Sequence, residues 1–289
     1  MSGGGNGTDG SSKAGNTVVS IVYSIIAVVA SIIMVMVWDL EKKVPANEMS
    51  LSSEEAQDAG KGAPKKAGGV LAKVLAAMKL WCDRPTVMLL NLIQVAFGVS
   101  ATLLYIQVSG TVVQARFGKT DSVTVVGFMA ATTALVAALC QVPFAKMSST
   151  RLGKPPFMIL SLSAFVVLGA LVAALPTATL GQWPILVLLY VLQGIGRAGY
   201  EGANKAIYAD FFPDDSIAAF GNVILFNGLA GSASSYIFGA SSGGVPLLST
   251  TAQSLISCVC GGLAIAGYVL AEVIHRRQKS NTAGYSQTE

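Results

Sequence analysis

Four polar side chains recur at every fourth position of an otherwise apolar segment, and three of them are charged, one acidic between two basic. Residues four apart share one face of a helix, so this spacing predicts a polar stripe. Charges at membrane depth are costly and usually face a protein interior or a wet cavity. Two interpretations stay open: a structural ladder of ion pairs, or a gate for an ion or substrate. The stripe consists of Gln193, Arg197, Glu201 and Lys205.

A stripe of small residues runs beside the polar one. Gly194, Ala198 and Gly202 are also spaced by four. Small residues let a neighbouring helix approach closely. The segment therefore has the features of a packed helix in a polytopic membrane protein.

Uncharged polar residues interrupt other apolar segments. Buried amides commonly form hydrogen bonds between membrane helices, so helix-to-helix contacts are one interpretation. The lining of a polar cavity is the other. The residues concerned are Asn91, Gln94, Thr102, Gln107, Asn204, Asn222 and Asn227.

Recognisable enzyme patterns are missing from the sequence. It holds no GxSxG, HExxH or Walker A motif, and its one histidine, His275, lies in a basic run after the last apolar segment. Its four cysteines lack metal-ligand spacing, and the aspartates around Pro213 fit a tight turn. We therefore expect no catalytic residue, cofactor or metal. The basic residues follow membrane sidedness, so we expect no nucleic-acid partner either.

The composition is that of a chain whose solvent is lipid. The 289 residues are 53% hydrophobic and only 12% charged, with a mean hydropathy of +0.62. A soluble domain usually carries about 25% charged residues. The sequence therefore predicts an all-α, polytopic membrane protein in contact with membrane lipid.

Seven segments are long and apolar enough to cross a bilayer, which takes about 20 residues. The first is followed by a polar region, and the other six come in close succession. We predict seven transmembrane helices near residues 17–38, 86–108, 122–143, 156–176, 184–205, 217–239 and 251–272.

The remaining segments predict the domain organisation. Residues 1–16 read as a disordered, extracytoplasmic N-terminus, 39–85 as a cytoplasmic linker, and 273–289 as a cytoplasmic tail. Within the linker, residues near 70–82 have the pattern of an amphipathic helix or, equally, of an extension of the next span. Residues 86–272 form a six-helix unit.

Lysine and arginine set the expected orientation. One lysine precedes the first span, whereas eight lysine and arginine residues follow it between residues 42 and 84. The loops at 177–183 and 240–250 have none. We therefore expect an extracytoplasmic N-terminus and a cytoplasmic C-terminus. Asn6 lies on the extracytoplasmic side in an acceptor sequence for N-glycosylation.

Two features resemble the major facilitator superfamily. One span, a long linker and six further spans are what remains of a twelve-helix transporter that starts at its sixth helix. The loop residues Arg151, Gly153 and Lys154 resemble the family's Asp-Arg-x-Gly-Arg loop, although Thr150 replaces the acid. The segments FGVSATLLYIQVSGTVV (97–113) and GIGRAGYEGANKAIYADFFPDDSIAAFGN (194–222) resemble the uncoordinated-93-like branch, and the resemblance covers roughly residues 86–275.

The resemblance implies the C-terminal half of a transporter-like fold and leaves two functions open. Members of the branch are implied to act as non-enzymatic modulators or trafficking escorts of a partner membrane protein. The alternative is a secondary transporter of a small solute or ion, with the chain as a shortened or partial form. Transport around a site between two halves would require an N-terminal half or a partner. The sequence names no substrate.

Overall fold

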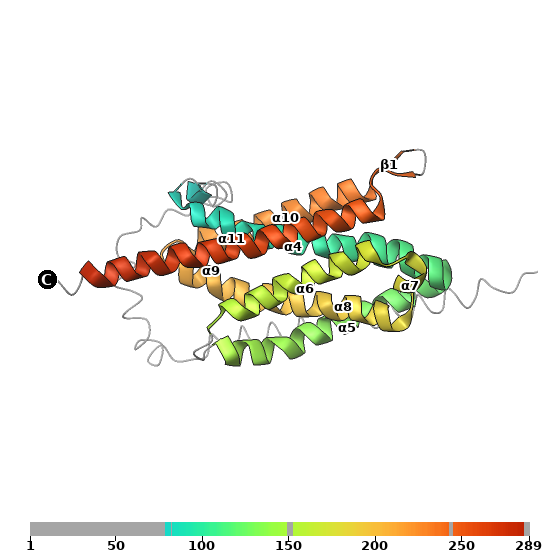
Figure 1. Ribbon diagram of the computed structural model, residues 1–289, viewed down its shortest axis with the longest axis horizontal. Coiled ribbons are helices and arrows are strands. Elements are labelled where there is room, and N and C mark those ends of the chain that lie inside the picture. Colours follow the sequence, from blue (N-terminus) through green and yellow to red (C-terminus); the bar gives the residue numbers. More distant parts are fainter. Residues whose placement is uncertain (1–78, 82, 149–152, 243–244, 286–289) are drawn as a thin grey trace, which may run out of the picture. The chain divides into compact units, whose positions relative to one another are not determined.

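The computed structural model describes residues 79–81, 83–148, 153–242 and 245–285 (Figure 1). The predicted N-terminus with Asn6, the first span at 17–38, nearly all of the linker, and Arg151 lie outside these residues. The elements are α4 (Pro85–Leu103), the π-helix η1 (Leu104–Val113), α5 (Gln114–Ser148), α6 (Pro155–Ala174), α7 (Thr177–Leu180), α8 (Trp183–Gly199), the π-helix η2 (Tyr200–Asn204), α9 (Lys205–Phe211), α10 (Ser216–Gly239), β1 (Ser241–Ser242), β2 (Val245–Pro246) and α11 (Thr250–Tyr285).

The all-α, polytopic membrane prediction is confirmed for the described part of the chain. Four continuous helical stretches there are long and apolar enough to cross a membrane: Pro85–Ser148, Pro155–Ala174, Ser216–Gly239 and Thr250–Gln278. The first of them contains two predicted spans. The predicted span at 184–205 coincides with α8 and η2, which continue into α9. Each of the six spans predicted between 86 and 272 therefore overlaps a helix.

Gly118 separates the first two of these spans. Its φ of 77° and ψ of 170° lie in a region that side-chain-bearing residues rarely adopt. The predicted loop at 109–121 is otherwise helical, because η1 continues α4 as far as Val113 and α5 begins at Gln114. Burial of apolar side chains such as Val112 and Val113 favours this continuation.

The C-terminal helix is longer than the sequence predicted. Residues 273–289 were expected as a tail, yet α11 continues to Tyr285. No glycine or proline occurs between 273 and 283, and Arg276 pairs with Glu272 one turn earlier. Both features favour helix propagation. The short antiparallel pair of β1 and β2 in the loop before α11 was not predicted.

The helices pack around α4 and α8. Helix α4 lies against α10 and α11, α11 lies against α6, and α8 packs between α5 and α6 (Figure 1). One core cluster includes Leu90, Phe165 and Tyr208, and a second includes Leu103 and Leu189. Proline occupies the first turn of α4, α6 and α8, where its missing N–H leaves no bond unmade. This packing sets α4 and α5 beside the polar stripe, which begins on α8.

Candidate functional site

The two charged residues at the middle of the predicted stripe form an ion pair. Arg197 Nε donates to Glu201 Oε1 at 2.7 Å, and Gln141 Nε2 of α5 donates to the other carboxylate oxygen at 3.3 Å. The side chains of Arg197 and Glu201 are 42% and 33% exposed. Lys205 is exposed and takes part in none of the ion pairs found among the described residues. The pair is therefore partly open, and α5 holds its acidic member.

The first residue of the stripe is tied to a different helix. Gln193 is 3% exposed, and its Oε1 accepts a hydrogen bond from Ser100 Oγ of α4 at 3.0 Å. The sequence-predicted stripe thus connects α8 to α4 at Gln193 and to α5 at Glu201.

A cleft lies where these helices meet, and we call it the polar cleft after its six polar lining residues, although most of its exposed surface is apolar. It has a volume of about 230 Å³, and its lining comes from α4, η1, α5 and α8. Ser109 and Tyr190 bring their hydroxyl oxygens within 2.6 Å of each other, and Thr133 Oγ1 donates to the backbone oxygen of Tyr190 at 3.1 Å. The polar members of the lining are Tyr105, Ser109, Thr133, Tyr190, Gln193 and Arg197.

Glycines set how closely α8 approaches its neighbours. A Cβ on Gly194 would lie 2.7 Å from Val136 Cβ of α5, and one on Gly196 would lie 2.1 Å from Phe165 Cε1 of α6. Gly199 is equally crowded by Ser161, whereas Gly202 has no such neighbour within 4 Å. Only part of the predicted small-residue stripe therefore forms a close helix contact. The close approach to α6 occurs at Gly196 and Gly199, which the spacing by four did not bring out.

A second, larger cavity lies where α6 begins and α9 ends, against residues 268–276 of α11, and we call it the helix-end cavity. Its volume is about 530 Å³. Lys154 Nζ of the predicted loop motif donates to Asp210 Oδ2 at 2.5 Å and to the backbone oxygen of Ala206 at 3.2 Å. Gly153, with φ 69°, makes the turn before α6 that places Lys154 there.

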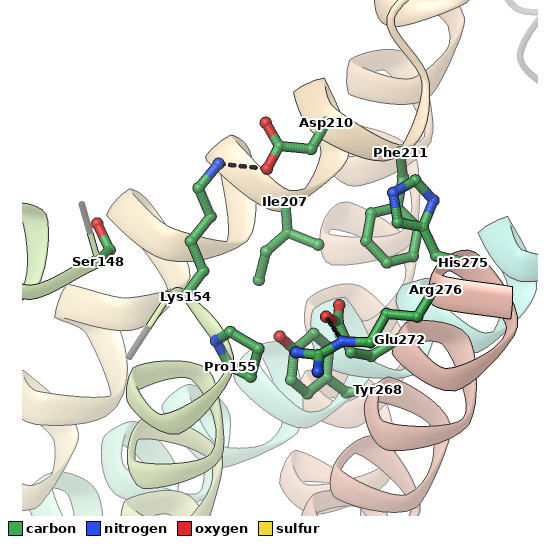
Figure 2. Close-up of a pocket in the computed structure, with 11 residues that line it drawn as sticks. Ser148, Lys154, Pro155, Ile207, Asp210, Phe211, Tyr268, Glu272, His275 and Arg276 are labelled. Carbon is green, nitrogen blue, oxygen red and sulfur yellow. Dashed lines mark hydrogen bonds and ion pairs between the residues drawn. The ribbon is translucent and has the colours of Figure 1, made fainter. Parts of the chain in front are cut away.

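The opposite side of the helix-end cavity comes from α11. Arg276 Nε donates to Glu272 Oε1 at 2.8 Å, and the His275 ring stacks on Phe211 with a centroid distance of 4.1 Å. Figure 2 shows these groups and the Lys154–Asp210 pair around the cavity. The sequence singled out Lys154 and His275 separately, but no spacing rule could bring them into one cavity.

Most of the polar residues in the predicted spans form contacts between helices. Gln107 Nε2 donates to Gln253 Oε1 at 2.7 Å, Ser234 Oγ donates to Thr102 Oγ1 at 3.0 Å, and Tyr208 donates to Asn91 Oδ1 at 2.8 Å. The side chain of Trp81 donates to Asn222. Asn204 differs, because both polar atoms of its buried side chain lack a hydrogen-bond partner among the described residues.

Cysteine and acidic residues give no metal site among the described residues, where no group of three His, Cys, Asp or Glu residues could hold a metal ion. Cys140, Cys258 and Cys260 are free thiols. Asp214 and Asp215 are exposed beside Pro213 in the turn before α10.

Comparison with known families gave one match. The family described as Major Facilitator Superfamily matches residues 112–287, which include α5 to α11. Comparison with curated proteins and comparison with solved structures each gave no match.

Proposed function

The chain belongs to the major facilitator superfamily, and we propose that its described helices form one half of a secondary transporter that binds a small solute with an anionic group. The family and the apolar helices make it a transporter-like, multi-pass membrane protein. The observation that carries the proposal is the polar cleft, in which polar side chains from η1, α5 and α8 line one space together with Arg197. Convergent polar groups in a concave site are typical of small-molecule binding.

Arg197 is the residue best suited to recognise the solute. Its Nε is engaged by Glu201, but its two terminal nitrogens have no partner among the described residues. A guanidinium binds carboxylate and phosphate through paired N–H donors. Ser109, Tyr190 and Gln193 would supply the neutral hydrogen bonds that orient the solute.

The polar cleft is one wall of the proposed site. Its volume of about 230 Å³ lies below the roughly 300–1,000 Å³ of ligand pockets. Transporters of this type hold solute between two halves that rock about a site near the midplane. The opposite wall would therefore come from a second six-helix half, in the same protein or in a partner.

A second candidate function is a modulator or trafficking escort of a partner membrane protein. The likeness of residues 194–222 to uncoordinated-93-like proteins supports it. So does an apolar face on α5 with the exposed side chains Phe128, Leu135, Leu139 and Val142. These positions recur at helical spacing, so one partner helix could cover them together.

Thiol labelling separates the two functions. In a chain whose four native cysteines are replaced by alanine, Ala130→Cys places a thiol in the polar cleft, and Leu139→Cys places one at an exposed position of α5 outside it. A transporter exposes the cleft to each side in turn. Ala130→Cys should therefore react with a membrane-impermeant methanethiosulfonate from both faces of sealed vesicles, and Leu139→Cys from neither.

Other labelling patterns count against transport. Reaction of Ala130→Cys from one face only indicates a fixed conformation and favours the escort. If neither cysteine reacts while both proteins are folded, the cleft is dry and the transporter proposal fails.

A further inference from the structure

The helix-end cavity carries two ion pairs on facing walls. Lys154 and Asp210 form one pair at 2.5 Å, and Glu272 and Arg276 form the other at 2.8 Å. Figure 2 shows the two pairs on either side of Ile207. The four formal charges sum to zero, so the cavity favours neither a simple anion nor a simple cation. A ligand that carries both charges on one short group matches this arrangement.

A buried hydroxyl in the same cavity has no partner in the described part of the chain. Tyr268 is 1% exposed and lines the cavity, yet its hydroxyl makes no hydrogen bond with the residues that the structure describes. Figure 2 shows that hydroxyl directed toward Pro155. Leaving such a group unpaired lowers stability, and most buried polar atoms find a partner. The hydroxyl therefore marks a place for a polar atom of a ligand.

The position of the cavity favours a lipid. It lies where α6 begins and α9 ends, beside Glu272 and Arg276, which follow the apolar part of α11. Charged residues at the ends of transmembrane helices lie at the depth of lipid headgroups. The lining also includes Pro155, Ile207 and Phe211, which suit the apolar part of an amphiphile. A volume of about 530 Å³ is ample for a headgroup.

We propose that the helix-end cavity binds the headgroup of a phospholipid that joins a phosphate to a primary ammonium group. The phosphate would lie between Lys154 and Arg276 and accept a hydrogen bond from Tyr268. The ammonium group would donate to Asp210 and Glu272. A choline headgroup has no N–H to donate, and an anionic headgroup leaves both carboxylates unmatched. This inference does not depend on whether the chain transports a solute.

The lipid preference tests the proposal directly. The delipidated full chain in detergent is titrated with phosphatidylethanolamine, phosphatidylcholine and phosphatidylglycerol of identical acyl chains, and the unfolding temperature is followed. Phosphatidylethanolamine should stabilise at the lowest concentration. Equal stabilisation by the choline lipid, or stronger stabilisation by the glycerol lipid, overturns the proposal. Soluble phosphoethanolamine is the remaining arm: if it stabilises and the lipid does not, the ligand is a soluble zwitterion and the lipid assignment fails.

Tyr268→Phe tests whether the cavity is the site. Because the hydroxyl has no partner among the described residues, its removal should not destabilise the delipidated protein. Apparent affinity for phosphatidylethanolamine should fall about two- to tenfold, the equivalent of one hydrogen bond. The matched control is Tyr236→Phe, the same change at an 80% exposed position of α10, which should leave the affinity unchanged. Equal affinities of both variants and the parent place the lipid elsewhere.

Glu272→Gln tests the charge pattern. It removes one negative charge and leaves the cavity with a net positive charge, so preference should move from phosphatidylethanolamine to phosphatidylglycerol. Asp210→Asn makes the same change on the facing wall and serves if Glu272→Gln does not fold. An unchanged preference order in the folded variant overturns the headgroup assignment.

Discussion

Replacing Gly196 by alanine gives a sharp test of how α8 packs. A Cβ there would lie 2.1 Å from Cε1 and 2.5 Å from Cζ of Phe165, which is only 1% exposed. Overpacking a core costs about 1–3 kcal/mol. Alanine in place of glycine otherwise stabilises a helix by up to about 1 kcal/mol. The cost of the clash with Phe165 is larger than the gain in helix propensity, so Gly196→Ala should destabilise the protein.

The control is Gly262→Ala. Gly262 lies in α11, and a Cβ there has nothing within 4 Å. This variant gains the higher helix propensity of alanine without a steric clash. The two substitutions should therefore change the unfolding temperature in opposite directions. In detergent we expect a loss of roughly 2–4 °C per kcal/mol for Gly196→Ala and no loss for Gly262→Ala.

A double-mutant cycle identifies the contact that is responsible. Phe165→Leu alone removes buried volume and should destabilise the protein. In combination with Gly196→Ala it should restore space for the new methyl group. The double variant should therefore be more stable than the sum of the two single losses implies, by about 0.5–3 kcal/mol. Additive losses, or an unfolding temperature of Gly196→Ala equal to that of the parent, would refute the assignment of Phe165 as the wall that α8 meets.

Three further predictions concern hydrogen bonds, charges and orientation. Gln253→Leu should lower the free energy of unfolding by about 1–3 kcal/mol, measured by thermal unfolding, because it leaves the buried amide of Gln107 without its acceptor. Arg197→Gln and Glu201→Gln should each cost about 0–1 kcal/mol in the same assay, because both side chains are partly exposed; a loss above 3 kcal/mol would show that the pair is buried. An N-terminal tag next to Asn6 should resist protease in sealed microsomes, and its digestion from the cytoplasmic side would reverse the predicted orientation.

The spans could be predicted because a run of about 20 apolar residues has few alternatives to a membrane helix. The helical continuation between the first two predicted spans, on either side of Gly118, and the continuation of α11 to Tyr285 were not predicted. Both lie where the chain is helical without being strongly apolar, and hydropathy does not mark the helix ends there. The low share of charged residues indicated a membrane protein, just as the long apolar runs indicated the spans.

The site was predictable only along single helices. Spacing by four brought out Arg197 and Glu201, since that is a property of one helix. The contacts of Gln193 with Ser100 and of Glu201 with Gln141 join residues far apart in the sequence. The π-helix η2 was not predicted either, because its extra residue is a small deviation that packing decides. Tyr200 within it stacks on Phe97 with a centroid distance of 3.8 Å.

The π-helix η2 affects the direction in which the polar stripe runs along the helix. Steps of four residues overshoot each turn of an α-helix by about 40°, since one turn takes 3.6 residues. Three such steps, from Gln193 to Lys205, would rotate the last side chain by about 120°. A π-turn takes one residue more than an α-turn, which removes about 100° of that rotation. With η2 at Tyr200–Asn204, a stripe of residues spaced strictly by four thus runs almost parallel to the helix axis. Deleting one residue of η2 would rotate the following helix by about 100° about its axis. Helix α9 would then present a different face to α4.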